Sequence, residues 1–120
     1  MKKIIHVDNS EFFRKLMGAY LQKEGFEFEG FDNPQEADMV IGSGSADMVI
    51  MGLTFADIGG PEFLERIKEF YGGPVIVLSS SLDKDRKGKL LSMGANAAIN
   101  KSGPWQQELR PYLLTLKSQS

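Results

Sequence analysis

Four short polar stretches hold the side chains best able to do chemistry, and each comes directly after an apolar run. They are Asp8–Ser10, Gly52–Thr54, Ser79–Ser81 and Asn100–Ser102. Together they supply one carboxylate, several hydroxyls and one lysine, which are groups that hold a magnesium ion or a small anion. They bring together neither a nucleophile with its base nor a pair of carboxylates, so we do not expect an enzyme.

The composition removes several other kinds of chemistry. The 120 residues include no cysteine and one histidine, His6, which excludes thiol catalysis, disulfides and the usual zinc or iron clusters. Fourteen basic and sixteen acidic residues give a net charge of -2, so no basic excess favours direct binding of nucleic acid. No apolar run approaches the roughly eighteen residues of a membrane helix. We expect a cytoplasmic protein with no metal, cofactor or membrane contact.

Short apolar runs predict the strands that position the polar stretches. Three runs rich in β-branched residues indicate parallel strands buried on both faces: Ile4–Val7, Met48–Met51 and Val75–Leu78. Two weaker candidates, 27–31 and 97–99, indicate strands nearer the sheet edges, the first because charged and apolar residues alternate along it. The sequence therefore predicts five strands.

Apolar residues at helical spacing predict helices between these strands. The first of these helices is capped by Ser10 and ends before Gly25. The other three begin at Pro61, at Asp83 and after Pro104. The helix after Asp83 should extend to Met93. Pro111 should kink or interrupt the last helix, because proline lacks the N–H that an interior turn uses.

One five-residue segment occurs twice, at 37–41 and again at 46–50. Asn33-Pro34 is a favourable helix start, so the first copy is predicted to end a short helix and the second to form the central strand. A hairpin of two strands is the alternative, since short apolar segments fit either structure.

Alternating strands and helices predict one α/β domain over residues 1–120, with 117–120 as a frayed tail. The expected architecture is a single doubly wound, five-stranded parallel sheet with helices on both faces. In such folds ligands bind at the carboxyl ends of the strands, where the strand order reverses. The four polar stretches should therefore meet at one edge of the sheet.

Taken in order, five segments of the chain resemble the receiver domain of bacterial response regulators, which has a flavodoxin-like fold. Residues 5–10 resemble its first strand, which ends in two adjacent acids, and 47–53 its third strand, which ends at the phosphoaccepting aspartate. Residues 57–60 resemble the loop beyond, 74–80 the fourth strand with its hydroxyl residue, and 94–101 the approach to the family's lysine. The resemblance implies a part in two-component phosphorelay signalling.

The departures from the receiver pattern fall on its chemistry. Gly52 stands at the position of the phosphoaccepting aspartate, and Asn9 takes the place of the second acid. Ala98 stands where receivers usually carry the Tyr or Phe of the conformational switch. The resemblance thus implies a remnant phosphorylation pocket made of Asp8, Asn9, Gly52, Ser79 and Lys101.

The charges of this pocket can be judged without the family. A lone Asp8 is a poor magnesium site, because the ion usually needs more than one carboxylate or a substrate phosphate. We expect Lys101 to lie against Asp8 or Asn9, so that the pair leaves the pocket uncharged overall.

Three other features have a functional and a structural interpretation. Asp57 has two interpretations, a displaced phosphoacceptor and a solvated loop carboxylate, and we expect the second. His6 has a functional interpretation, phosphohistidine chemistry or metal binding, and a structural one, a hydrogen-bonded imidazole of the core. We expect the structural one. The serines at 79–81 either hold an anion or form a polar turn that caps the next helix.

A basic cluster marks the helix predicted after Asp83, and it consists of Lys84, Arg86, Lys87 and Lys89. Such charges usually form a solvated helix face. In receivers, however, this helix, the fifth strand and the last helix form the output surface. The cluster is therefore a candidate partner-binding site, and the protein is expected to be a monomer or a weak homodimer through this surface.

The leading hypothesis is a receiver-like module that is not phosphorylated at the usual site. It would act through contacts with a signalling protein or an effector domain. The alternative is a small-molecule or anion-binding module that uses the pocket of Asp8, Asn9, Ser79 and Lys101.

Overall fold

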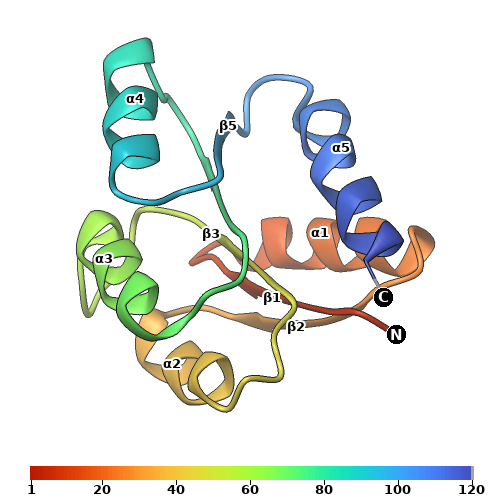
Figure 1. Ribbon diagram of the computed structural model, residues 1–120. Helices are drawn as coiled ribbons and strands as arrows, with labels where there is room; N and C mark the ends of the chain where they lie inside the picture. The colour runs from red at the N-terminus through yellow and green to blue at the C-terminus, as the bar shows by residue number, and fades with distance from the viewer. Residues whose placement is uncertain (120) are drawn as a thin grey trace.

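Five parallel strands form one central sheet in the computed structural model, which describes residues 1–119 (Figure 1). The strands are β1 (Lys3–Val7), β2 (Glu27–Phe31), β3 (Met48–Met51), β4 (Val75–Ser79) and β5 (Ala97–Asn100). Their order is β2-β1-β3-β4-β5, and each neighbouring pair is parallel. The two weaker strand candidates are the two edges of the sheet. The predicted doubly wound sheet is confirmed.

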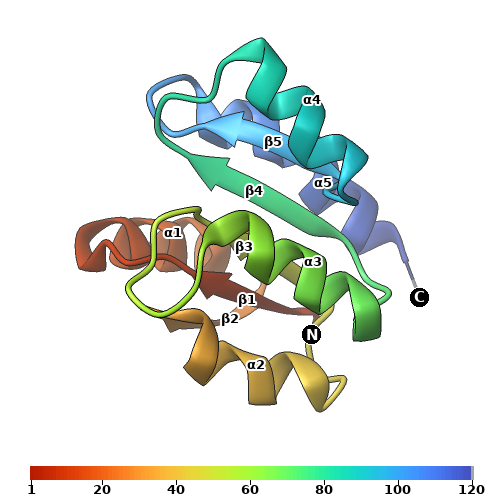
Figure 2. The ribbon, with the colours of Figure 1, turned by 90° about the vertical axis from the view of Figure 1, so that its left-hand side faces the viewer.

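Helices cover both faces of the sheet, with α1 and α5 on one face and α2, α3 and α4 on the other (Figure 2). Their bounds are α1 (Glu11–Lys23), α2 (Pro34–Gly42), α3 (Gly60–Phe70), α4 (Lys84–Ser92) and α5 (Trp105–Ser118). Each face has its own apolar core, because β-strand side chains point alternately to the two sides. Within residues 1–119, none of these helices has both the length and the apolar character that a membrane crossing requires.

Side-chain caps start three of the helices where the sequence predicts them. Ser10 Oγ accepts a hydrogen bond from the Phe13 N–H at 3.1 Å at the start of α1. Asn33 caps α2 in the same way, and Asp83 caps α4. Each cap satisfies an N–H that the first helical turn leaves without a partner. At the other end of α1, Gly25 has a φ of +92°, the left-handed conformation that ends many helices.

The two copies of the repeated segment adopt different structures, as predicted. Residues 37–41 lie in α2, and 46–50 lead into and form most of β3. Met39 in the first copy is 82% exposed, whereas its equivalent Met48 is 1% exposed. The capped Asn33-Pro34 start makes the first copy helical, while the second is paired between β1 and β4.

The structure differs from two expectations about the last helix: Pro111 does not interrupt it, and it includes the first two residues of the predicted tail. Helix α5 continues through Pro111 without interruption. Pro111 and Gln107 are both exposed, so water can reach the carbonyl that loses its helical donor. Lys117 and Ser118 belong to the last turn of α5 and not to a frayed tail, because Lys117 pairs with Glu24 at 3.7 Å. Ser120 lies outside the described residues.

Candidate functional site

A polar pocket of about 270 Å3 opens at the carboxyl ends of β1, β3 and β4. It lies beside the pair β1 and β3, where the strand order reverses, which is the usual ligand position in this kind of sheet. We call it the strand-end pocket, and it is lined by Asp8, Asn9, Gly52, Leu53, Thr54, Ser79, Ser80, Arg86 and Lys101. The structure thus brings together all five pocket residues selected from the sequence.

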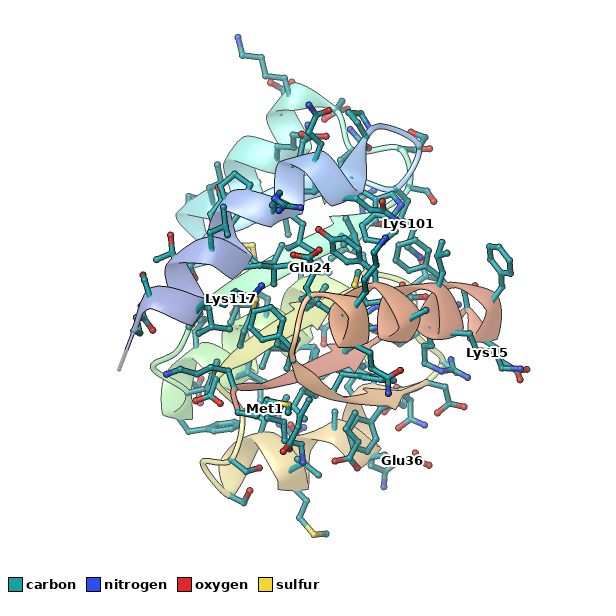
Figure 3. The ribbon with its side chains drawn as sticks, turned by 90° about the vertical axis from the view of Figure 1, so that its right-hand side faces the viewer. Met1, Lys15, Glu24, Glu36, Lys101 and Lys117 are labelled. Carbon is teal, nitrogen blue, oxygen red and sulfur yellow. The ribbon has the colours of Figure 1, made fainter. Side chains whose placement is uncertain are left out.

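Asp8 is the buried centre of the pocket, with 1% of its surface exposed. Its Oδ1 accepts a hydrogen bond from the Ser10 N–H at 2.9 Å, and its Oδ2 lies 2.7 Å from Lys101 Nζ. Lys101 reaches from the end of β5 toward α1 (Figure 3), where its Nζ lies 4.4 Å from the centre of the Phe13 ring. The expected contact between Lys101 and Asp8 is therefore present, and it neutralises the buried carboxylate.

A second cation supports Asp8 through its backbone. The Arg14 guanidinium donates a hydrogen bond to the Asp8 carbonyl oxygen at 2.6 Å. Arg14 lies one turn into α1, so the same helix that Ser10 caps also fixes the end of β1. Nothing in the sequence indicated this role for Arg14, because an arginine on an amphipathic helix usually faces water.

His6 is buried in β1 behind the pocket, as expected, but the expected hydrogen bond is absent. Its Nε2 lies 3.8 Å from Asp8 Oδ2, and neither ring nitrogen has a hydrogen-bond partner among residues 1–119. The hydrogen bond is absent because the imidazole packs edge-on against the Phe13 ring, with the two ring centroids 5.9 Å apart. Burial lowers the pKa of His6 to about 4, against the opposing effect of Asp8, so the imidazole is neutral at pH 7.

Gly52 leaves space at the end of β3. A Cβ atom added here would lie 3.4 Å from Asp8 Oδ2 and 3.8 Å from the Leu78 carbonyl oxygen, which are ordinary van der Waals distances. Gly60, at the far end of the same loop, is different, because its Cβ would lie 2.5 Å from Leu53 Cα. Packing therefore requires glycine at 60 but not at 52.

The loop between β4 and α4 forms one wall of the pocket and is held by Asn100. The Asn100 Oδ1 accepts from the Leu82 N–H at 2.6 Å, and its Nδ2 donates to the Leu82 carbonyl at 3.0 Å. Ser79 and Ser80 line the pocket, whereas Ser81 does not and has a φ of 58°. The sequence showed Asn100 as a polar residue at a strand end, but nothing in it indicated this pair of bonds.

Arg86 of the basic helix α4 also lines the pocket, while remaining exposed. The sequence predicts a pocket that is uncharged overall, and this side chain changes that expectation. The first turn of α4 follows the pocket wall directly, so this side chain reaches the mouth of the pocket while Lys84, Lys87 and Lys89 do not line it. Asp8 carries one negative charge, whereas Lys101 and Arg86 each carry a positive one, and the formal charge is therefore +1.

The sequence-predicted output surface forms one side of the molecule, where α4, β5 and α5 are neighbours. We call it the α4–β5–α5 face. Ala98 is half-buried there, and it lines a groove of about 370 Å3 together with Leu91 and Tyr112. Leu91 is 47% exposed. The face therefore combines a shallow apolar groove with the basic side chains of α4.

Asp57 lies outside the strand-end pocket, in the exposed loop after β3. Its Oδ2 accepts a hydrogen bond from the Gln35 N–H at 3.1 Å, in the first turn of α2. A carboxylate at this position stabilises the helix start by satisfying an unpaired N–H. The geometry favours this structural role for Asp57 over that of a displaced phosphoacceptor.

The pocket residues do not fit a divalent cation. Among residues 1–119, no three His, Asp or Glu side chains lie close enough to share a metal ion. The one carboxylate of the pocket already binds Lys101, and Arg86 adds a second positive charge. Magnesium prefers several oxygen ligands and a negative site, and this donor set provides neither.

Comparisons with curated proteins find relatives among signalling regulators. The chain is 31% identical over 107 residues to the chemotaxis protein CheY of Halobacterium salinarum, covering 88% of each chain. It is 28% identical to the regulatory protein VanRc of Enterococcus gallinarum, covering 83% of this chain and 43% of the relative. It is 25% identical to the transcriptional regulatory protein SrrA of Staphylococcus aureus, covering 98% of this chain and 49% of the relative. The chain thus spans less than half the length of the last two.

Solved structures share the fold. The BeF3-activated receiver domain of RstA from Klebsiella pneumoniae superposes with a TM-score of 0.88 at 24% identity, covering 98% of this chain and 100% of that one. Chemotaxis protein CheY4 of Vibrio cholerae gives a TM-score of 0.83 at 23% identity, covering 97% of this chain and 98% of that one. The family model of the response regulator receiver domain matches residues 4–111, and the chain belongs to that family.

Proposed function

We propose that this two-component receiver domain acts through protein contacts and is not phosphorylated at the end of β3. One observation carries the proposal: Gly52 takes the position at which receivers carry the phosphoaccepting aspartate. A glycine has no side chain to receive a phosphoryl group, and phosphoryl transfer depends on an acceptor held in line with its donor.

The charges around Gly52 support the same conclusion. Receivers use three carboxylates to bind magnesium beside the acceptor, and here only Asp8 remains, already paired with Lys101 at 2.7 Å. Asn9 is exposed and adds no charge. The protein therefore lacks both the acceptor and the carboxylates that would hold the neutralising ion beside the transferred group. We propose no other catalytic activity for it.

The α4–β5–α5 face is the proposed contact surface. Lys84, Lys87 and Lys89 give it positive charge, so the partner should carry an acidic patch. Ala98 replaces the switch aromatic of receivers, so we propose that the face keeps one conformation whatever the state of the pocket. The partner is a cytoplasmic signalling protein or an effector domain, and the receiver is a monomer or a weak homodimer through this face.

Intact mass spectrometry tests the central claim. The protein is incubated with acetyl phosphate and magnesium, beside an active receiver as the positive control. We expect the control to gain a phosphoryl group and this protein to keep its mass. A stoichiometric gain of one phosphoryl group, mapped to Asp57 or to any pocket residue, would show that the chemistry is retained and that the proposal is wrong.

A further inference from the structure

We propose that the strand-end pocket binds a small free oxyanion, a phosphate or a carboxylate, reversibly and without a divalent cation. This inference goes beyond the proposed function, because signalling through the α4–β5–α5 face requires no ligand in the pocket. It depends on three features of the pocket: its surplus positive charge, its hydrogen-bond donors and the space beside Gly52.

The surplus charge comes from Arg86. Among residues 1–119, Asp8 is the only carboxylate that lines the pocket, and its charge is matched by Lys101. Arg86 makes no ion pair with any residue of that range. One positive charge therefore remains, and it belongs to a planar guanidinium whose N–H groups match the two oxygens of a carboxylate or phosphate.

Asp8 leaves little unpaired negative charge to repel an anion. One of its oxygens accepts the Ser10 N–H, and the other is 2.7 Å from Lys101 Nζ. The Lys101 ammonium has three donors and its side chain is 20% exposed, so it can bind Asp8 and a second oxygen together. Lys101 is thus positioned to bridge the fixed carboxylate and a bound anion.

The remaining wall supplies neutral donors and room. Thr54, Ser79 and Ser80 contribute hydroxyl groups, and a hydroxyl can turn its hydrogen toward an oxyanion. Gly52 adds no side chain, although a Cβ there would fit at 3.4 Å from its nearest neighbour. The anion would occupy the space that a carboxylate on residue 52 would otherwise fill.

Nuclear magnetic resonance titration of the 15N-labelled protein tests the site. Sodium phosphate and sodium acetate are added in separate arms, with sodium chloride at matched ionic strength as the control. We expect saturable shifts at Gly52–Thr54, Ser79, Ser80 and Arg86 with at least one oxyanion and none with chloride. Equal shifts with chloride, or shifts spread over the surface, would mean ionic screening only and would overturn the inference.

Two variants assign the binding to the pocket. Arg86→Gln should weaken oxyanion binding about fivefold or more, because it removes the unpaired charge. Lys87→Gln is the matched control, since it removes the same charge from the same helix outside the pocket lining, and its affinity should be unchanged. Equal weakening in both variants would show that the oxyanion responds to the general charge of α4, and the inference would be wrong.

Gly52→Asp provides an internal competitor. It places a carboxylate in the proposed anion position, so the shifts caused by phosphate and acetate should disappear. Undiminished binding in a folded Gly52→Asp protein would place the anion elsewhere and overturn the inference. The proposed function is judged separately, because phosphoryl gain in the mass experiment does not depend on whether the wild-type pocket binds an anion.

Discussion

The strand-end pocket and the α4–β5–α5 face carry similar charged residues, but they use them in different ways. In the pocket, Asp8 is buried: its Oδ1 accepts a hydrogen bond from the Ser10 N–H, and its Oδ2 forms an ion pair with Lys101. On the face, Lys84 and Lys89 are exposed and make no ion pair within residues 1–119. Charges of the first kind affect folding, whereas charges of the second kind affect encounter with a partner.

The largest effect should come from removing the cation of the pocket. Lys101→Met leaves the Asp8 carboxylate buried without its ion-pair partner, which should lower the free energy of unfolding by roughly 3 kcal/mol. This loss of stability is at the lower end for a buried ion pair, because the Lys101 side chain is 20% exposed. Urea denaturation at pH 7 measures the change.

The double variant Asp8→Asn with Lys101→Met is the control for this prediction. It removes both charges, and the new amide can still accept the Ser10 N–H. Most of the lost stability should therefore return. If the single and double variants are equally unstable, the cost comes from lost packing around Phe13 and not from an unpaired carboxylate.

The next largest effect is the pH dependence of the free energy of unfolding, which His6 gives to the region behind the pocket and which the face lacks a histidine to produce. The pKa of His6 falls from 6.5 to about 4 in the folded protein, mainly through burial. The unfolded chain therefore binds a proton between these pH values and the folded protein does not, so stability is lost as the pH falls from 6.5 to 4. The loss from this residue should reach about 2 to 3 kcal/mol.

His6→Val tests this sign. The variant cannot take up the proton when it unfolds, so its free energy of unfolding should fall less between pH 6.5 and pH 4 than that of the wild type. The comparison uses the difference between the two slopes, because carboxylates remote from His6 contribute equally to both proteins. Parallel curves would contradict the lowered pKa.

The sequence predicted the sheet, its edges and the pocket's location, because these follow from local patterns. Apolar runs mark the strands, and the polar residues that end parallel strands must meet at one edge. The pocket position of Arg86 was not predicted, since helical spacing gives the face of a helix but not how far a long side chain reaches. A helix that starts at the pocket wall, directly after Asp83, was the available signal.

Other features of the site depend on contacts between distant parts of the chain. Asn100 holds the Leu82 backbone across 18 residues of sequence. The missing partners of His6 depend on which side chains surround the ring, and Asp57 caps a helix that begins 23 residues before it. Periodicity and composition record none of these pairings, because each depends on how the elements pack together.

The smallest effect on stability should come from the face. Replacing Lys84, Lys87 and Lys89 together by glutamine removes solvated charges, so the free energy of unfolding should change by no more than about 0.5 kcal/mol. Binding to a cognate partner captured by pull-down should weaken about tenfold, because charges at an interface steer association. The wild-type affinity should also fall with salt, since exposed charges are screened beyond about 10 Å at 0.1 M ionic strength.

Arg86→Gln is the pocket variant that completes the comparison between pocket and face. Arg86 lies on the same helix, and its replacement removes one positive charge where the triple lysine variant removes three, but its side chain lines the pocket. If the face is the contact surface and the pocket is not coupled to it, this variant should bind the partner as the wild type does. If Arg86→Gln abolishes partner binding while the triple lysine variant retains it, the pocket is the functional surface and the proposed division between the two regions is wrong.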